Sequence, residues 1–346
     1  MINLEKEIRE QPEVLGKIKD NNIETIRRIV ADIKAGQITN VYFAARGTSD
    51  HASIYAQYLI HRFLGIPCAL ATPSTLTLYQ KPMHLEHSLV IGVSQSGKAE
   101  DGLAVLKSGN QAKTITIAVT NDPNSPMASE AKYHLFCGAG PEVSIAATKT
   151  FTSQMYLLAL LCAEWAQNDK LFALLDKIPA AVSELLDNMP SQIEAIISRY
   201  RYLDDAFILG RGMAYPIALE GALKILETNK IRVRGYASSD FHHGPMAQIS
   251  PKTLVFVLAP KGPAMEDALQ MIGRIESIGA ELITVTDDAA LAASKPFALL
   301  IPDVGCDCGA PFLLAVTMQL FALKLTEVKG IDPDVSDVLK KITITK

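Results

Sequence analysis

The sequence predicts an α/β protein built from two copies of one domain, each a parallel β-sheet with helices on both faces. Short apolar runs of strand length alternate with helical patterns, which is typical of βαβ units and a parallel sheet. Segments of the second half also repeat segments of the first half at a nearly constant spacing. A chain of 346 residues is long enough for about two domains.

The first half supplies the pattern of elements. Two amphipathic helices are predicted at its start, Leu4–Ile18 and Asn22–Ile33, joined at residues 20–21 and ended by Gly36. Apolar runs then predict five strands, with a helix after the first of them. The strands cover residues 41–45, 67–71, 88–93, 114–120 and 134–137, and the helix covers residues 53–63.

The repeat is visible in three segments. Residues 41–47 match residues 206–212, which places Arg211 165 positions after Arg46. Leu89-Val90 matches Leu254-Val255 at the same spacing, and residues 119–122 match residues 285–288 one position further on. We therefore expect five parts: an N-terminal helical segment, a first domain, a broken helical linker, a second domain and a C-terminal tail that closes the active site. These cover residues 1–36, 37–166, 167–199, 200–330 and 331–346, and the linker is expected to break at Pro179 and Pro190.

The turn Ser94-Gln95-Ser96-Gly97, here called the phosphate turn, lies between a predicted strand and a helical pattern. Unpaired N–H groups at a helix N-terminus attract anions. The turn has neither the triphosphate-binding nor the dinucleotide-binding glycine pattern. It therefore indicates a phosphate site, although serine is also an ordinary helix cap. The matching turn in the second copy, residues 259–263, contains two prolines, which remove N–H donors.

Three charged residues of the second half, Glu220, Lys224 and Glu227, share one face of a predicted helix. One interpretation is a solvated stripe with helix-stabilising pairs. The apolar neighbours favour another, in which the helix lies in a core where each charge needs a partner. His243 precedes Gly-Pro, so it is either a positioned imidazole or an ordinary surface histidine.

Composition excludes several classes of function. The net charge of −4 gives no basic footprint for nucleic acid or anionic membranes, so a small-molecule partner is expected. The charged N-terminus has no apolar signal region, and no apolar stretch of membrane-spanning length was identified, so we expect a cytoplasmic protein. An odd number of cysteines in apolar surroundings predicts reduced, buried thiols. They are Cys68, Cys137, Cys162, Cys306 and Cys308.

Cys306-Asp307-Cys308 contains the one close cysteine pair of the sequence. No further Cys or His ligands follow at zinc-type spacing. We therefore expect no resident metal, and no cofactor.

Five motifs, taken together, resemble the sugar isomerase (SIS) domain pair, and most of all the isomerase half of glucosamine-6-phosphate synthase and its stand-alone relatives. The resemblance runs from Lys6 to Asp332. It implies two SIS domains, each a three-layer αβα, flavodoxin-like unit. The motifs are residues 46–49, 94–97, 147–151, 218–224 and 243–245.

The resemblance also implies substrate contacts. Residues of the family that match Ser94, Gln95 and Ser96 bind the sugar phosphate, and those that match Thr48 and Ser49 hold the phosphate and sugar hydroxyls. Ala147 and Glu220 are expected beside the same ligand.

Catalytic roles follow from the same resemblance. Glu227 matches the carboxylate that moves a proton between sugar C1 and C2, with Lys224 beside it. His243 matches the ring-opening histidine, which in the family comes from the neighbouring subunit of a homodimer. Lys341 matches a lysine that lines the sugar and can form an imine. A carbonyl shift requires these types of group, namely acid and base catalysts and a cation near the enediolate.

The departures from the family pattern shape the expected activity. Ala99 and Ala147 stand where the synthases carry hydroxyls, and His242 stands where they carry lysine. Because the chain starts directly in the helical segment, we expect no glutaminase activity. The leading hypothesis is deamination of glucosamine 6-phosphate to fructose 6-phosphate and ammonia. The alternatives are a fructosamine-6-phosphate deglycase, an aldose–ketose isomerase for another sugar phosphate, and a non-catalytic sensor.

Overall fold

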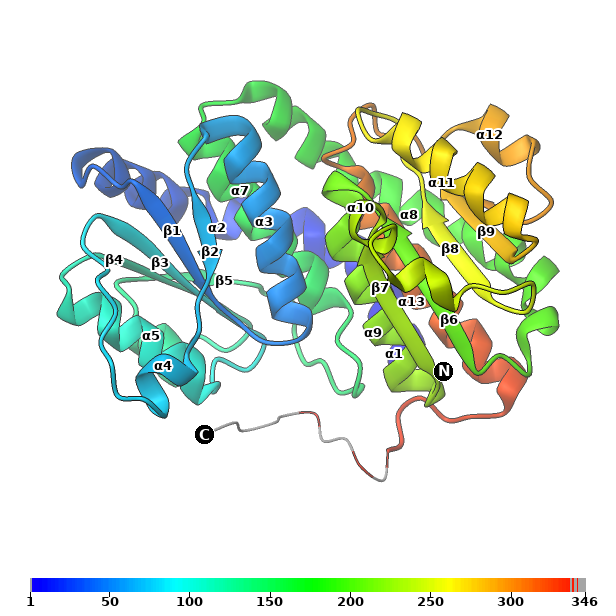
Figure 1. Cartoon of the computed structure of the whole chain (residues 1–346). Helices are drawn as coiled ribbons and strands as arrows, with labels where there is room; N and C mark the ends of the chain where they lie inside the picture. The colour runs from blue at the N-terminus through cyan, green and yellow to red at the C-terminus, as the bar shows by residue number, and fades with distance from the viewer. Residues whose placement is uncertain (1, 337, 339–340, 342–346) are drawn as a thin grey trace. The chain divides into compact units, whose positions relative to one another are not determined.

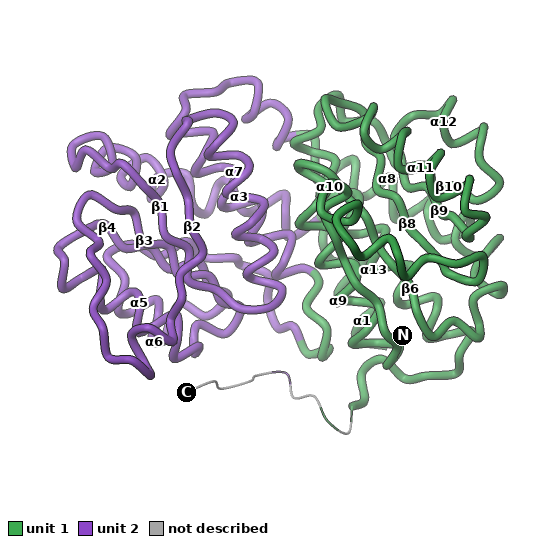
Figure 2. The backbone as a smooth tube through the Cα atoms, viewed as in Figure 1, with its two compact units in different colours: residues 1–12, 143–148, 177–339 green, residues 13–142, 149–176, 340–346 purple. Residues whose placement is uncertain are grey.

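The computed structural model describes residues 2–336, 338 and 341 (Figure 1). The chain forms two compact units, each assembled from separate stretches of sequence (Figure 2). Unit 1 contains residues 1–12, 143–148 and 177–339, and unit 2 contains residues 13–142, 149–176 and 340–346.

Unit 2 is built on a five-stranded parallel sheet with the order β2-β1-β3-β4-β5. Its strands are β1 (Asn40–Ala44), β2 (Cys68–Leu70), β3 (Ser88–Ser94), β4 (Ile115–Thr120) and β5 (Tyr133–Phe136). Its helices include α3 (Thr48–Leu64), α4 (Ser74–Thr77), α5 (Glu100–Gln111), α6 (Pro126–Glu130) and α7 (Lys149–Trp165). All five predicted strands are confirmed, but α3 begins five residues earlier than expected.

In unit 2, both faces of the sheet pack against helices. Ala44, Val90 and Ala118 pack with Leu106 of α5 and Met127 of α6, while α3 and α7 pack against each other and contact the sheet. Helices therefore cover both faces, as two-sided burial of a parallel sheet requires.

Unit 1 repeats this plan with the strand order β10-β9-β8-β6-β7. Its strands are β6 (Asp205–Gly210), β7 (Arg232–Ala237), β8 (Leu254–Leu258), β9 (Glu281–Thr286) and β10 (Ala298–Leu300). Its helices include α1 (Asn3–Arg9), α9 (Tyr215–Asn229), α10 (Ser238–Phe241), α11 (Met265–Ile278), α12 (Ala289–Ala293) and α13 (Ala310–Lys329). Short 3₁₀ turns lie at residues 198–200, 212–214 and 245–248.

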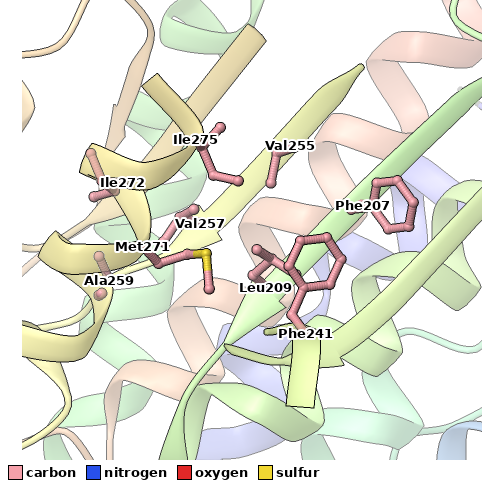
Figure 3. Packing of buried hydrophobic residues seen from close by; sticks show 10 residues of the cluster. Phe207, Leu209, Phe241, Val255, Val257, Ala259, Met271, Ile272 and Ile275 are labelled. Carbon is pink, nitrogen blue, oxygen red and sulfur yellow. The ribbon is translucent and has the colours of Figure 1, made fainter. Parts of the chain in front are cut away.

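In unit 1, the two faces of the sheet also pack against different helices. Figure 3 shows Val255 beside Ile275 of α11, and Phe207 beside Phe241 in the same cluster. On the other face, Phe256 meets Phe321 of α13 edge-on, with ring centroids 4.9 Å apart. Each unit is thus a three-layer α/β/α domain.

Helix α13 corrects one expectation. Among the described residues, it alone is long and apolar enough to span a membrane by length and composition, and 83% of its most apolar window is buried in the structure. A helix that is apolar all round is typical of a protein core. The sequence analysis missed this stretch.

Two helix boundaries also differ from prediction. The N-terminal break lies at Glu10 rather than at residues 20–21, and α2 then runs unbroken over Gln11–Ala35. Pro12 is tolerated in the first helical turn, and Asn22 points its amide at the Ile18 and Phe136 carbonyl oxygens instead of ending the helix. Helix α2 ends at Ala35, directly before Gly36, as expected.

The linker helix is also longer than expected. α8 spans Asp169–Ile197 and continues through both Pro179 and Pro190. The expected breaks there were therefore wrong. Its apolar side is buried, for example at Ile178 and Met189, so packing outweighs the lost backbone hydrogen bonds.

Candidate functional site

The phosphate turn lies where the strand order of unit 2 changes direction. β1 and β3 are neighbours in the sheet, yet the connections leave them in opposite directions. In open α/β sheets, ligands bind at the carboxyl ends of strands at such a switch point. The turns that follow β1 and β3 therefore form the candidate ligand edge.

The phosphate turn has a fixed geometry. Ser94 Oγ accepts from the Gly97 N–H at 3.2 Å, and Ser96 Oγ accepts from the Lys98 N–H at 3.3 Å. Gly97 has φ +63°, and a Cβ there would lie 2.1 Å from Ser125 Oγ. Only glycine fits this position.

The serines of this turn do not cap the following helix. The N-cap of α5 is Ala99, which makes no side-chain cap hydrogen bond. This weighs against the interpretation of the serines as ordinary caps. Gln95 and Ser96 are half-buried.

The turn after β1 lies beside the phosphate turn. α3 begins at Thr48 after Gly47, whose φ is +54°. Arg46 pairs with Asp101 in the first turn of α5, with 2.8 Å between Nη2 and Oδ2. Ser49 is buried and Thr48 half-buried. The ion pair joins the turn after β1 to the helix that follows the phosphate turn.

Lys341 also belongs to unit 2. Its Nζ lies 2.9 Å from Oε2 of Glu142, a fully buried carboxylate. Glu142 also accepts hydrogen bonds from the Thr150 backbone N–H at 3.1 Å and from Thr150 Oγ1 at 2.8 Å. Sequence reasoning missed Glu142. Its signal was an acidic residue in a loop otherwise rich in small residues.

Unit 1 carries the charged row on α9. Lys224 is 2% exposed and Glu220 1% exposed. Lys224 Nζ lies 3.4 Å from Glu220 Oε1 and 2.7 Å from Glu227 Oε2. Glu227 is more open, with 21% of its side chain exposed. The row is therefore not a solvated stripe, and one ammonium group bridges two carboxylates.

Close packing fixes α9 in place. A Cβ at Gly235 of β7 would lie 2.4 Å from the Ala218 carbonyl oxygen, and one at Gly221 would lie 2.9 Å from Met318 Cγ. Such approaches allow little movement of the helix. They hold the charged row at a defined height above the sheet.

His243 lies on an exposed turn after α10. Its backbone N–H donates to the Asp240 carbonyl oxygen at 3.0 Å, and Gly244 follows with φ +135°. Its neighbour His242 is also exposed. The turn is defined, and the imidazole faces solvent.

Ala147 lies in the loop 143–148, which belongs to unit 1. Glu7 of α1 is 3% exposed and accepts hydrogen bonds from the Ser144 N–H, the Ser144 hydroxyl and the Val143 N–H. This buried carboxylate ties the loop to α1. Sequence reasoning missed Glu7, because a charged residue near a terminus is usually exposed.

Comparison with known proteins decides the family. The model of the SIS domain matches residues 37–163 and 204–328. The chain belongs to the SIS domain family. Its two matched segments correspond to the sheets of unit 2 and unit 1, so the predicted repeat is confirmed.

Relatives of this SIS chain include isomerising aminotransferases. The glutamine–fructose-6-phosphate aminotransferase of Aquifex aeolicus is 33% identical over 332 residues, which is 95% of this chain and 55% of that protein. The Zymomonas mobilis enzyme of the same name is 32% identical, over 99% of this chain and 58% of that protein. The chain thus spans a little over half the length of these relatives.

Solved structures agree with this grouping. A candidate phosphosugar isomerase from Silicibacter pomeroyi is 29% identical, with a TM-score of 0.87 over 96% of this chain and 100% of that one. The C-terminal domain of glucosamine-fructose-6-phosphate aminotransferase from Francisella tularensis is 26% identical, with a TM-score of 0.87 over 96% of this chain and 97% of that one. Glucosamine-6-phosphate deaminase from Thermotoga maritima, 23% identical, shares the fold with a TM-score of 0.79 over 99% of this chain and 100% of that one.

The two SIS copies differ at their carboxyl edges. In the second copy, the Lys261 N–H donates to Asp287 Oδ1 at 2.7 Å, and Lys261 Nζ lies 2.9 Å from Asp303 Oδ2. Pro260 and Pro263 have no N–H to offer. Both donor groups of Lys261 are thus engaged by carboxylates of the protein, which supports the expected loss of phosphate binding there.

None of the five cysteines of this SIS protein forms a disulfide in the structure. Cys137, Cys162 and Cys308 are buried, but Cys68 and Cys306 are only half-buried, so the expected burial fails at two positions. Burial raises the pKa of Cys68 to about 12. Cys306 differs, because a hydrogen bond from the Cys308 side chain lowers its pKa to about 7.

Proposed function

We propose that this chain is a phosphosugar isomerase that acts as a deaminase, converting glucosamine 6-phosphate and water to fructose 6-phosphate and ammonia. The observation that carries the proposal is the buried row Glu220–Lys224–Glu227, in which Glu227 alone is open to solvent. A partly exposed carboxylate held by a buried ammonium group is a suitable proton-transfer group. The aminotransferase relatives, with an isomerising activity in their names, support the same chemistry.

In the proposed reaction, the carbonyl shift starts from the amino sugar. In the open-chain substrate, Glu227 removes the proton from C2 and returns it at C1. The C1 aldehyde becomes an alcohol by gaining, on its oxygen, the proton that the C2 amine loses as it becomes an imine. Water then adds to the imine carbon and ammonia leaves, which gives the ketose. Water is the only co-reactant that this direction needs.

Other residues take supporting roles in the proposal. The phosphate turn, with Thr48 and Ser49, anchors the phosphate. Lys224 orients the Glu227 carboxylate, and Glu220 positions Lys224 from a distance of 3.4 Å. Lys341 contributes a cation near the carbonyl end of the sugar, held by Glu142 at 2.9 Å.

A substrate panel tests the reaction. The purified chain is incubated with glucosamine 6-phosphate, a fructosamine 6-phosphate, and other aldose and ketose phosphates, and ammonia and sugar products are measured. The proposal predicts equal amounts of ammonia and fructose 6-phosphate from the first substrate. Turnover of another substrate without ammonia release would contradict deamination. Binding without any turnover would instead support a sensor.

We also propose that His243 opens the ring in the site of a partner subunit within a homodimer. The exposure of this imidazole on a defined turn supports the proposal. Inactive Glu227→Gln and His243→Asn variants are mixed after dissociation. A site shared across a two-fold axis predicts recovery of about a quarter of wild-type activity in a 1:1 mixture. No recovery, with dimer exchange verified, would place both groups in one chain.

A further inference from the structure

Two cysteines and an aspartate form a cluster in the second SIS copy, and none of them is assigned a role in the proposed reaction. Cys306, Asp307 and Cys308 occupy the loop between β10 and α13. One atom of each side chain, two sulfurs and a carboxylate oxygen, lies within 4.8 Å of the other two. Cys308 is buried, and the other two are half-buried. The cluster is therefore partly accessible from solvent.

The separations between these atoms suit a tetrahedral metal centre. Asp307 Oδ1 lies 3.5 Å from Cys306 Sγ and 3.8 Å from Cys308 Sγ. Bonds of about 2.3 Å to sulfur and 2.0–2.2 Å to oxygen imply tetrahedral S···O edges of about 3.5–3.7 Å. The two S···O separations are already close to these distances, and the two sulfurs lie within 4.8 Å of each other.

The surrounding backbone holds the cluster in this arrangement. The Gly309 N–H donates to the Cys306 carbonyl oxygen at 3.0 Å, and the Gly305 N–H donates to Asp303 Oδ1 at 2.7 Å. A Cβ at Gly262 would lie 2.9 Å from Asp307 Cβ. The loop therefore packs directly on the turn that follows β8. Such preorganisation favours binding.

The position of the cluster in the fold also bears on the kind of ion that it would bind. The carboxyl edge of the first SIS copy carries hydroxyl groups, whereas the same edge of the second copy carries two thiols and a carboxylate. Thiolate ligands select thiophilic ions such as Zn²⁺ over Mg²⁺ and Ca²⁺, which prefer oxygen ligands. Three protein ligands leave a fourth coordination position for water or an added ligand.

We propose that Cys306, Asp307 and Cys308 form a binding site for a thiophilic divalent cation of the Zn²⁺ class. The sequence analysis expected no metal because no further ligands follow at zinc-type spacing. In the proposed site the third ligand is Asp307, the residue between the two cysteines.

Titration of the reduced full chain with Co²⁺ under anaerobic conditions tests the site. We expect one equivalent to bind, with the visible bands of tetrahedral Co²⁺ and a thiolate charge-transfer band, and Zn²⁺ to displace it. Cys306→Ser should weaken Co²⁺ binding at least about tenfold and reduce the charge-transfer band. Asp307→Asn should weaken binding while keeping that band.

Control variants keep the test decisive. Cys68→Ser removes the other half-buried thiol and should leave both bands unchanged. Because Cys308 is buried and its loss could disturb folding, the half-buried Cys306 carries the main test, with thermal unfolding as a check. Absence of both bands at stoichiometric Co²⁺, or bands that persist in Cys306→Ser, would overturn the proposal. Oxidation of the pair to a disulfide without metal binding would also overturn it.

Discussion

Replacement of Lys224 by methionine tests whether the charged row of α9 is a buried, mutually compensated group. The ammonium group lies 3.4 Å from Glu220 and 2.7 Å from Glu227. Methionine keeps most of the side-chain volume but leaves Glu220, which is 1% exposed, without its counter-charge. Loss of one partner of a buried ion pair costs about 3–5 kcal/mol. In a domain of this size, that lowers the Tm by about 6–20 °C.

Differential scanning calorimetry of three variants completes this test. The double variant Glu220→Gln/Lys224→Met removes the charge together with its partner, so it should recover most of the lost stability. Lys324→Met is the matched control. Lys324 pairs with Glu327 on α13 at 2.9 Å, but that carboxylate is 43% exposed, so we expect a loss of about 0–1 kcal/mol. Equal losses for Lys224→Met and Lys324→Met would refute the reasoning, as would a double variant less stable than Lys224→Met.

Three further outcomes are expected. Ser96→Ala should raise the KM for the sugar phosphate with little change in kcat, and an unchanged KM would speak against the phosphate turn. Gly235→Ala should lower the free energy of unfolding by about 1–3 kcal/mol, because its Cβ would lie 2.4 Å from the Ala218 carbonyl oxygen. Gly16→Ala is the control. A Cβ at Gly16 has nothing within 4 Å, so this variant should not destabilise the protein. Burial raises the pKa of Asp50 above its usual 3.8, so wild-type stability falls as the pH rises from 3.8 through the folded-state pKa. Asp50→Asn should therefore raise the Tm at neutral pH but not below pH 3.8, and equal shifts at both pH values in thermal melts would contradict this.

Local patterns were enough to predict the layers of the fold. Each predicted strand of the first half, such as residues 88–93, is an apolar run whose length and flanking turns fix its identity. The repeat then carried the same order into the second half, because residues 206–212 match the first strand and turn. Helix boundaries were less predictable. The unbroken α8 depends on burial of residues such as Ile178, which a local proline signal does not contain.

In the candidate site, too, local patterns predict some features, whereas others depend on tertiary packing. The phosphate turn and the charged row have local spacings that the sequence displays. The burial of Lys224 is a tertiary property, so spacing alone left a solvated stripe open. Glu7 accepts a hydrogen bond from Ser144, which is distant in the sequence. Glu142 lies in an irregular loop and accepts a hydrogen bond from Thr150. No periodicity marks such residues.

The central claim is that Glu227 transfers the proton that converts the amino sugar to the ketose. The most direct test is the kcat for ammonia release from glucosamine 6-phosphate by Glu227→Gln, measured together with the Kd for the sugar phosphate. We predict a fall in kcat of about 10²- to 10⁴-fold with the Kd nearly unchanged. Wild-type turnover by this variant would contradict the account.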